Sequence, residues 1–305
     1  MKFDELTNVY LPIVNPLIAA ANGTAYQALF LEPNVAGIGP DTPIEFLYEL
    51  RSVYLWGILE RSHLTCMTYL ARASQWLSAA SMAMREDSLL GFASGLRGHL
   101  ESAADAFDVL QHLPNTLSKS MRYAFLALEH PADLGPAFVN FGPLEDALIH
   151  YAYARGKTAP QVPPEHKKKS SWTYNDQLTK FGVPGVHQLY ETLCELVHPA
   201  APSVLCFLDE ERGSLVFNAN RDQELIADIA SKYEDTIQQM TQYTLNSALI
   251  SLSLLQRLNR SWVAATDEQM NGVGNVAVTL AAFDRFAVNY QAGQVDRMEI
   301  FKELS

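Results

Sequence analysis

Residues 89–113, LLGFASGLRGHLESAADAFDVLQHL, decide the fold that we expect, because they read as one helix with no purely solvent-facing side. At 100° per residue, one stripe is apolar and typical of a core-facing surface. Its members are Leu89, Ala93, Leu96, Leu100, Ala103, Phe107 and Leu110. A second stripe carries only small residues, which let another backbone come close although each glycine costs about 1 kcal/mol relative to alanine. These are Gly91, Gly95, Gly98, Ser102 and Ala106, and we expect another element to pack there.

A third row of this helix mixes ionisable and apolar side chains one turn apart. It consists of Leu90, Arg97, Glu101, Ala104 and Asp108. Arg97 and Glu101 are i,i+4 neighbours, and such a pair contributes only about 0.3 to 0.5 kcal/mol when it is exposed. The row is the best candidate for a polar site, and a solvated ion pair with no further role is the alternative.

The composition fits either one large helical domain or two smaller ones, and we expect the protein to be cytoplasmic. The chain has 305 residues, of which 48% are hydrophobic, so the size of the core is not limiting. A net charge of −12 disfavours a general affinity for nucleic acid. Three cysteines without a CxxC pair favour reduced thiols over disulfides or a cysteine zinc site. The N-terminus is acidic and no apolar run is long enough for a membrane span, so we expect no membrane association.

The rest of the chain favours an all-α, multi-helix bundle with one short β-hairpin, in a single domain over 1–305. Helical periodicity extends over 4–21, where Pro12 and Pro16 interrupt it, and over 43–84, 117–130, 143–155, 186–198, 221–258, 276–290 and 295–304. We expect Pro114 to close the central helix, and residues 203–208 and 214–218 to form the hairpin. Residues 157–171 carry three prolines and a basic cluster, which predicts an exposed loop and a possible domain boundary.

Two segments carry a resemblance to a known group of proteins. LRGHLESAADAF, at 96–107, and LYETLCELVHPAAPSV, at 189–204, resemble uncharacterised prokaryotic all-helical proteins of the abortive-infection-like type, which are grouped near the HEPN superfamily. In that pattern an Arg-x3-Glu helix is followed by a helix that ends in Tyr-x7-His, and the matching positions are Arg97, Glu101, Tyr190 and His198. The resemblance covers about a third of the chain. It implies a helical bundle with a role in defence or toxin-like systems.

HEPN ribonucleases, the best-understood relatives, place a histidine four to six residues after an arginine, and this chain departs from that spacing. Seven residues lie between Arg122 and His130, and only one residue lies between Arg61 and His63. A site could still be composed across two helices, with His198 as general acid or base and Arg97 stabilising charge. Glu101 and Tyr190 would orient these two groups, and Glu195 lies beside them on the second helix. The alternative is a buried polar network that fixes helix registry without catalysis.

Two further patterns have weaker chemical implications. Glu60 and His63, like Glu195 and His198, have Glu-x-x-His spacing, which carboxylate-bridged dimetal bundles use, but such matches arise easily by chance. The basic cluster at 166–169 gains interest only if it lies beside Arg97, and is otherwise a solvated loop.

We therefore expect a cytoplasmic defence or stress protein that binds a protein or RNA partner. A metal-independent ribonuclease and a carboxylate-histidine dimetal bundle are the alternatives. We assign no metal and no cofactor, and a homodimer is a further alternative for the assembly.

Overall fold

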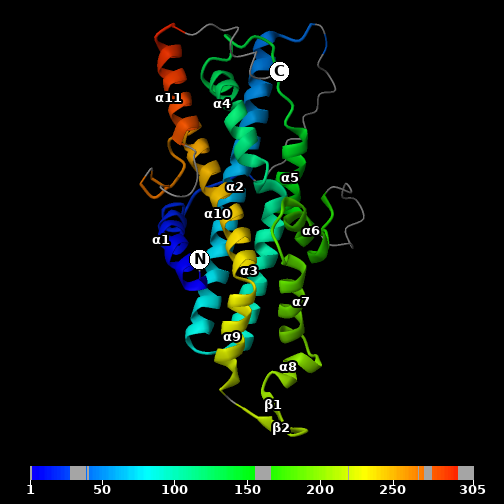
Figure 1. Cartoon of the computed structure of the whole chain (residues 1–305). Helices are drawn as coiled ribbons and strands as arrows, with labels where there is room; N and C mark the ends of the chain where they lie inside the picture. The colour runs from blue at the N-terminus through cyan, green and yellow to red at the C-terminus, as the bar shows by residue number, and fades with distance from the viewer. Residues whose placement is uncertain are drawn as a thin grey trace. The chain divides into compact units, whose positions relative to one another are not determined.

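The computed structural model confirms the all-α class (Figure 1). It describes residues 2–27, 39, 41–154, 166–218, 220–266, 268–270 and 277–294. Within these residues, a single two-stranded antiparallel sheet accompanies the helices. The elements are α1 Phe3–Ala20, α2 Ile44–Arg85, α3 Leu89–Leu110, α4 Leu113–Glu129, α5 Gly142–Tyr153, α6 Ser171–Phe181, α7 Val186–Val197, α8 Ala201–Leu205, β1 Leu208–Glu211, β2 Ser214–Phe217, α9 Arg221–Lys232, α10 Glu234–Leu258 and α11 Ala277–Gln291. No helix in this part of the chain is both long enough and apolar enough for a bilayer crossing.

The chain divides into two compact units. Unit 1 comprises Met1–Ala19, Thr68–Asp108 and Lys169–Leu245, and unit 2 comprises Ala20–Met67, Val109–Lys168 and Asn246–Ser305. Four of the borders fall inside helices, namely α1, α2, α3 and α10. Another falls between Lys168 and Lys169, within the predicted exposed loop, much of which lies outside the described residues. The expectation of one helical domain stays a prediction.

The small-residue stripe of α3 packs against α2 in unit 1, as the sequence predicts. A Cβ added to Gly95 would lie 2.7 Å from the backbone nitrogen of Ala80, and one added to Gly98 would lie 2.5 Å from the indole ring of Trp76. Every member of the apolar stripe is at most 1% exposed. α3 is therefore held on two sides, which leaves its mixed polar row to face other elements.

Replacing Gly95 with alanine should destabilise the protein, because the added methyl group meets backbone rather than a movable side chain. Overpacking of this kind costs about 1 to 3 kcal/mol. The matched control is Gly57→Ala on α2, where a Cβ meets only the guanidinium of Arg61 at 3.4 Å. That change should be neutral or stabilising by up to about 1 kcal/mol. Urea denaturation measures both, and equal stability of the two variants contradicts the close approach of α2 and α3.

Several boundaries differ from those that the sequence predicts. α1 is unbroken although Pro12 and Pro16 lie inside it, and its buried face of Leu6, Tyr10, Val14 and Leu17 keeps helical spacing throughout. α3 ends at Leu110, and Pro114 stands in the first turn of α4 rather than closing α3. Proline suits that place because the N–H it lacks has no partner within the helix there.

The hairpin exists, but it is shorter than predicted and begins later. Residues 203–205 belong to the short helix α8, and the strands pair Leu208 with Phe217 and Glu211 with Ser214. Arg212 and Gly213 have φ values of 49° and 78°, as a two-residue hairpin turn of the mirror-image type requires. All four residues of β2 are exposed. The predicted last helix, 295–304, lies outside the described residues.

Each unit buries one histidine completely. In unit 1, Nε2 of His99 on α3 lies 2.8 Å from the hydroxyl of Thr241. In unit 2, Nδ1 of His63 lies 2.7 Å from the hydroxyl of Tyr26, and the imidazole stacks on Trp262 with ring centroids 5.0 Å apart. Both side chains are 0% exposed. Burial disfavours the imidazolium and lowers the pKa of each histidine to about 4.

The protein should lose stability as the pH falls below 6.5. The unfolded chain takes up a proton on each histidine near pH 6.5, whereas the folded chain does so only near pH 4, so the loss accumulates between these values. For His99 it amounts to roughly 2 to 3 kcal/mol by pH 4.5. Urea denaturation from pH 7.5 to 4.5 should show a smaller decline for His99→Gln than for wild type. Identical slopes for His99→Gln and wild type would refute the buried neutral imidazole.

Candidate functional site

Two helices of unit 1 bring the predicted polar residues together. Arg97 lies on α3 between the two glycines that pack on α2. α7 buries Val186, Leu189 and Leu193, so the adjoining arc that carries Tyr190 is available to contact α3. α7 ends at Val197, and the C-cap residue His198 has an extended backbone because a proline follows. The backbone N–H of His198 still donates to the carbonyl of Cys194 at 2.9 Å, which fixes the point where the imidazole leaves the helix.

Four of the five predicted site residues are in contact. Arg97 donates from Nε and Nη2 to Oε1 of Glu101, at 3.2 and 3.1 Å, and from Nη1 to Nε2 of His198 at 3.1 Å. Its guanidinium carbon lies 5.7 Å from the centroid of the Tyr190 ring. Glu195, the fifth residue, is exposed on α7 and has no polar contact with these four. We call Arg97, Glu101, Tyr190 and His198 the arginine cluster.

The contacts define which groups of the cluster donate hydrogen bonds and which accept them. A guanidinium only donates hydrogen bonds, so Nε2 of His198 is the acceptor in this contact. Partial burial by itself lowers the pKa of Arg97, but the Glu101 carboxylate more than offsets this and raises the pKa overall. Burial, together with Cys194 and Glu101, raises the pKa of Tyr190, which therefore stays a phenol. The cluster thus combines a guanidinium–carboxylate pair with a phenol and an imidazole.

The arginine cluster is open to solvent. The side chains of Arg97 and Glu101 are 22% and 35% exposed, and His198 is exposed. Unit 1 as a whole is acidic, with 9 Lys and Arg against 18 Asp and Glu. A ligand can therefore reach Arg97, but the surrounding field repels a long polyanion.

A second aromatic contact of unit 1 was not foreseen from the sequence. The Trp172 indole on α6 stacks on the His187 imidazole on α7, with ring centroids 3.9 Å apart, and Trp172 is 51% exposed. Ser170 caps α6 by accepting the N–H of Thr173 at 3.1 Å, which sets the start of the helix. The Ser-x-x-Thr pattern signals this cap, but only the packing of α6 on α7 reveals the stacked rings.

The basic cluster does not join Arg97. Lys169 pairs with Asp108 at 2.5 Å, and Asp108 lies about three turns along α3 from Arg97. His166 lies 3.5 Å from Asp146 of α5 in unit 2. A role of the basic cluster in binding phosphate required it to lie beside Arg97. That role therefore has no support.

The predicted metal ligands are divided between the units. Glu60 and His63 belong to unit 2, and Glu195 and His198 belong to unit 1. Within the described ranges, no group of three or more His, Cys, Asp or Glu side chains is arranged to hold a metal ion.

Comparison of the chain with family models, with curated proteins and with solved structures finds no significant match in any of the three. The chemistry of the described side chains is therefore the evidence on function.

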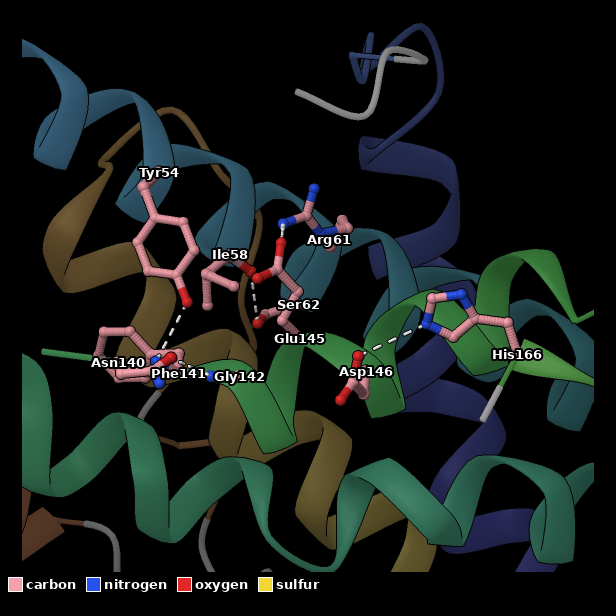
Figure 2. A network of polar contacts seen from close by, with 10 residues as sticks. All are labelled: Tyr54, Ile58, Arg61, Ser62, Asn140, Phe141, Gly142, Glu145, Asp146 and His166. Atoms are coloured by element: carbon pink, nitrogen blue, oxygen red, sulfur yellow. Dashed lines mark hydrogen bonds and ion pairs between the residues drawn. The ribbon is translucent and has the colours of Figure 1, made fainter. Parts of the chain in front are cut away.

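Unit 2 contains a second polar network, which sequence reasoning missed (Figure 2). Arg61 of α2 donates to Glu145 of α5 at 2.7 Å, and the hydroxyl of Tyr54 accepts the N–H of Phe141 at 3.1 Å. The partners of each pair are more than 80 residues apart in sequence, so no local pattern could reveal them. This network borders a pocket that is described below.

If the arginine cluster serves binding rather than folding, His198→Ala should leave stability nearly unchanged. The imidazole is exposed, and an exposed polar contact contributes at most about 0.5 kcal/mol. His99→Ala is the contrasting variant, because it removes a buried side chain and leaves Thr241 without its partner, at a cost of about 2 kcal/mol or more. Thermal and urea unfolding compare the two. A loss of several kcal/mol for His198→Ala would assign the cluster to the fold.

Proposed function

We propose that the protein binds single-stranded RNA through the arginine cluster of unit 1, as a cytoplasmic defence or stress component. The observation that carries the proposal is the convergence of a guanidinium, a phenol ring and an imidazole at one partly exposed place, with Arg97 3.1 Å from His198 and 5.7 Å from the Tyr190 ring. RNA recognition combines these groups, because arginine contacts phosphate and aromatic or imidazole rings stack on unpaired bases.

The electrostatics of unit 1 restrict the kind of RNA. Glu101 offsets much of the charge of Arg97, and the unit has twice as many acidic as basic residues. Affinity therefore comes from one or two phosphates and from stacking, not from a long basic track. A short unpaired segment suits these conditions, whereas duplex nucleic acid does not.

Fluorescence anisotropy with a short labelled single-stranded RNA tests the proposal. Binding should be nearly independent of base sequence and should weaken only mildly with salt, with a log–log slope of about −1, because one or two phosphates are contacted. Arg97→Gln should lower the affinity about tenfold, which corresponds to one charge-assisted contact.

The matched control is Arg72→Gln. Arg72 also belongs to unit 1 and pairs with a carboxylate of α3, Asp105, at 2.7 Å, but it is not part of the arginine cluster. This variant should bind RNA like wild type. Equal losses for both arginines indicate a diffuse electrostatic effect, and absence of any RNA binding by the full chain overturns the proposal in favour of a protein partner or a homodimer.

A metal-independent ribonuclease is the second candidate, and the adjacency of His198 and Arg97 favours it. In such a reaction the neutral imidazole takes the proton of a ribose 2′-OH, and the 2′-oxygen forms a bond to phosphorus. The P–O5′ bond breaks, water protonates the leaving oxygen, and Arg97 stabilises the charge on the phosphoryl oxygens.

Incubation of the labelled RNA in EDTA should then yield fragments that end in a cyclic phosphate, and His198→Ala should stop the cleavage without lowering the melting temperature. Intact RNA eliminates this candidate and leaves the binding proposal in place.

A further inference from the structure

Unit 2 contains an apolar pocket that is independent of the arginine cluster. Its volume is about 560 Å³, which lies in the range of small-molecule sites. The first part of α2, the segment 136–140 and Glu145 of α5 line it. Aromatic and aliphatic side chains make up most of the wall, including Leu47, Tyr48, Leu50, Tyr54 and Phe138.

Arg51 contributes a buried cation to this pocket. The residue is 2% exposed, and its guanidinium donates only to backbone carbonyls: from Nη1 to Gly135 and Ala137 at 2.7 and 2.9 Å, and from Nη2 to Pro131 at 2.8 Å. Nε is buried and has no hydrogen-bond partner. No carboxylate in the described residues pairs with this guanidinium. A buried charge without a counter-ion and with a donor to spare favours an anionic ligand.

The acidic residue of the pocket does not supply that counter-ion. Glu145 accepts from Arg61 at 2.7 Å, so its charge is already compensated (Figure 2). Burial acts to lower the pKa of Arg51, and the phenols of Tyr123 and Tyr48 are the groups that act to raise it. The charges of Arg51, Arg61 and Glu145 therefore leave one positive charge at the pocket.

The remaining groups define the body of the ligand. The Tyr54 and Phe138 rings lie 5.1 Å apart at 33°, and the Tyr48 ring lies 5.2 Å from the Arg51 guanidinium carbon. Asn140 uses its Oδ1 to accept the N–H of Gly142 at 2.8 Å, so its amide hydrogens are available to a ligand. Flat aromatic or alkyl groups fit such walls.

We propose that this pocket binds a small organic carboxylate with an aromatic or alkyl body. The carboxylate pairs with Arg51, and the body lies against Tyr48, Tyr54 and Phe138. An ammonium ligand in an aromatic cage would be the opposite assignment, but it would meet an uncompensated arginine and a glutamate that is already paired. The proposal concerns unit 2 alone and does not depend on RNA binding by unit 1.

Isothermal titration calorimetry on the full chain tests the proposal with three probes that share one body: 4-phenylbutyrate, 4-phenylbutan-1-ol and 4-phenylbutylamine. The carboxylate should bind at least tenfold more tightly than the alcohol, and the amine most weakly.

Leu50→Trp should abolish binding of the carboxylate, because it fills the pocket. Arg51→Met should reduce the affinity for the carboxylate to that for the alcohol, whereas Arg122→Met should not. Arg122 is the matched control, since it also lies over an aromatic ring of unit 2, Phe286 at 4.9 Å, but outside the pocket.

The design stays decisive if Arg51→Met does not fold, because Arg51 also holds the segment 131–137. Phe138 is 54% exposed, so Phe138→Ala removes part of the wall without a large effect on stability, and it should weaken the binding of all three probes. Circular dichroism confirms the fold of each variant. Equal or tighter binding of the alcohol or the amine, or wild-type binding by Leu50→Trp, overturns the proposal.

Discussion

The close approach of α2 and α3 at Gly95 is the constraint on which unit 1 depends. Because Ala80 contributes backbone atoms to that contact, the two helices cannot separate or rotate without either a void or a clash. Arg97 stands two residues further along α3 and projects from a different side of it, so its direction is set by packing and not by its own contacts. The small-residue stripe of α3 therefore determines where the arginine cluster lies, although its residues take no part in the chemistry of the cluster.

The two arginines on which the proposals rest are in opposite electrostatic situations. Arg97 is partly exposed and shares its charge with Glu101, so salt and water moderate whatever it binds. Arg51 is buried among carbonyl oxygens, where water and salt have little access. The first situation suits a reversible contact with a flexible polymer. The second suits a small ligand that brings its own charge.

Sequence patterns predicted the fold class and four members of the arginine cluster, and the reasons are physical. Helical periodicity reports on burial one turn at a time, so α2, α3 and α7 were found with nearly correct limits. Tyr190 and His198 were found because both lie on one helix that resembles a known pattern. The pocket around Arg51 could not be found in this way. The Arg51 guanidinium contacts backbone carbonyls 80 to 86 residues away in sequence. Every residue has a backbone carbonyl, so the sequence does not indicate which of them an arginine will contact.

Each unit is assembled from three separate stretches of chain, and four of the borders lie within continuous helices. Neither unit corresponds to a block of sequence that gene fusion or exchange could transfer intact. A recombination event that moved the segment 169–245 would carry Tyr190 and His198 but not Arg97. Transfer of that segment alone would therefore separate the imidazole from the guanidinium that it contacts.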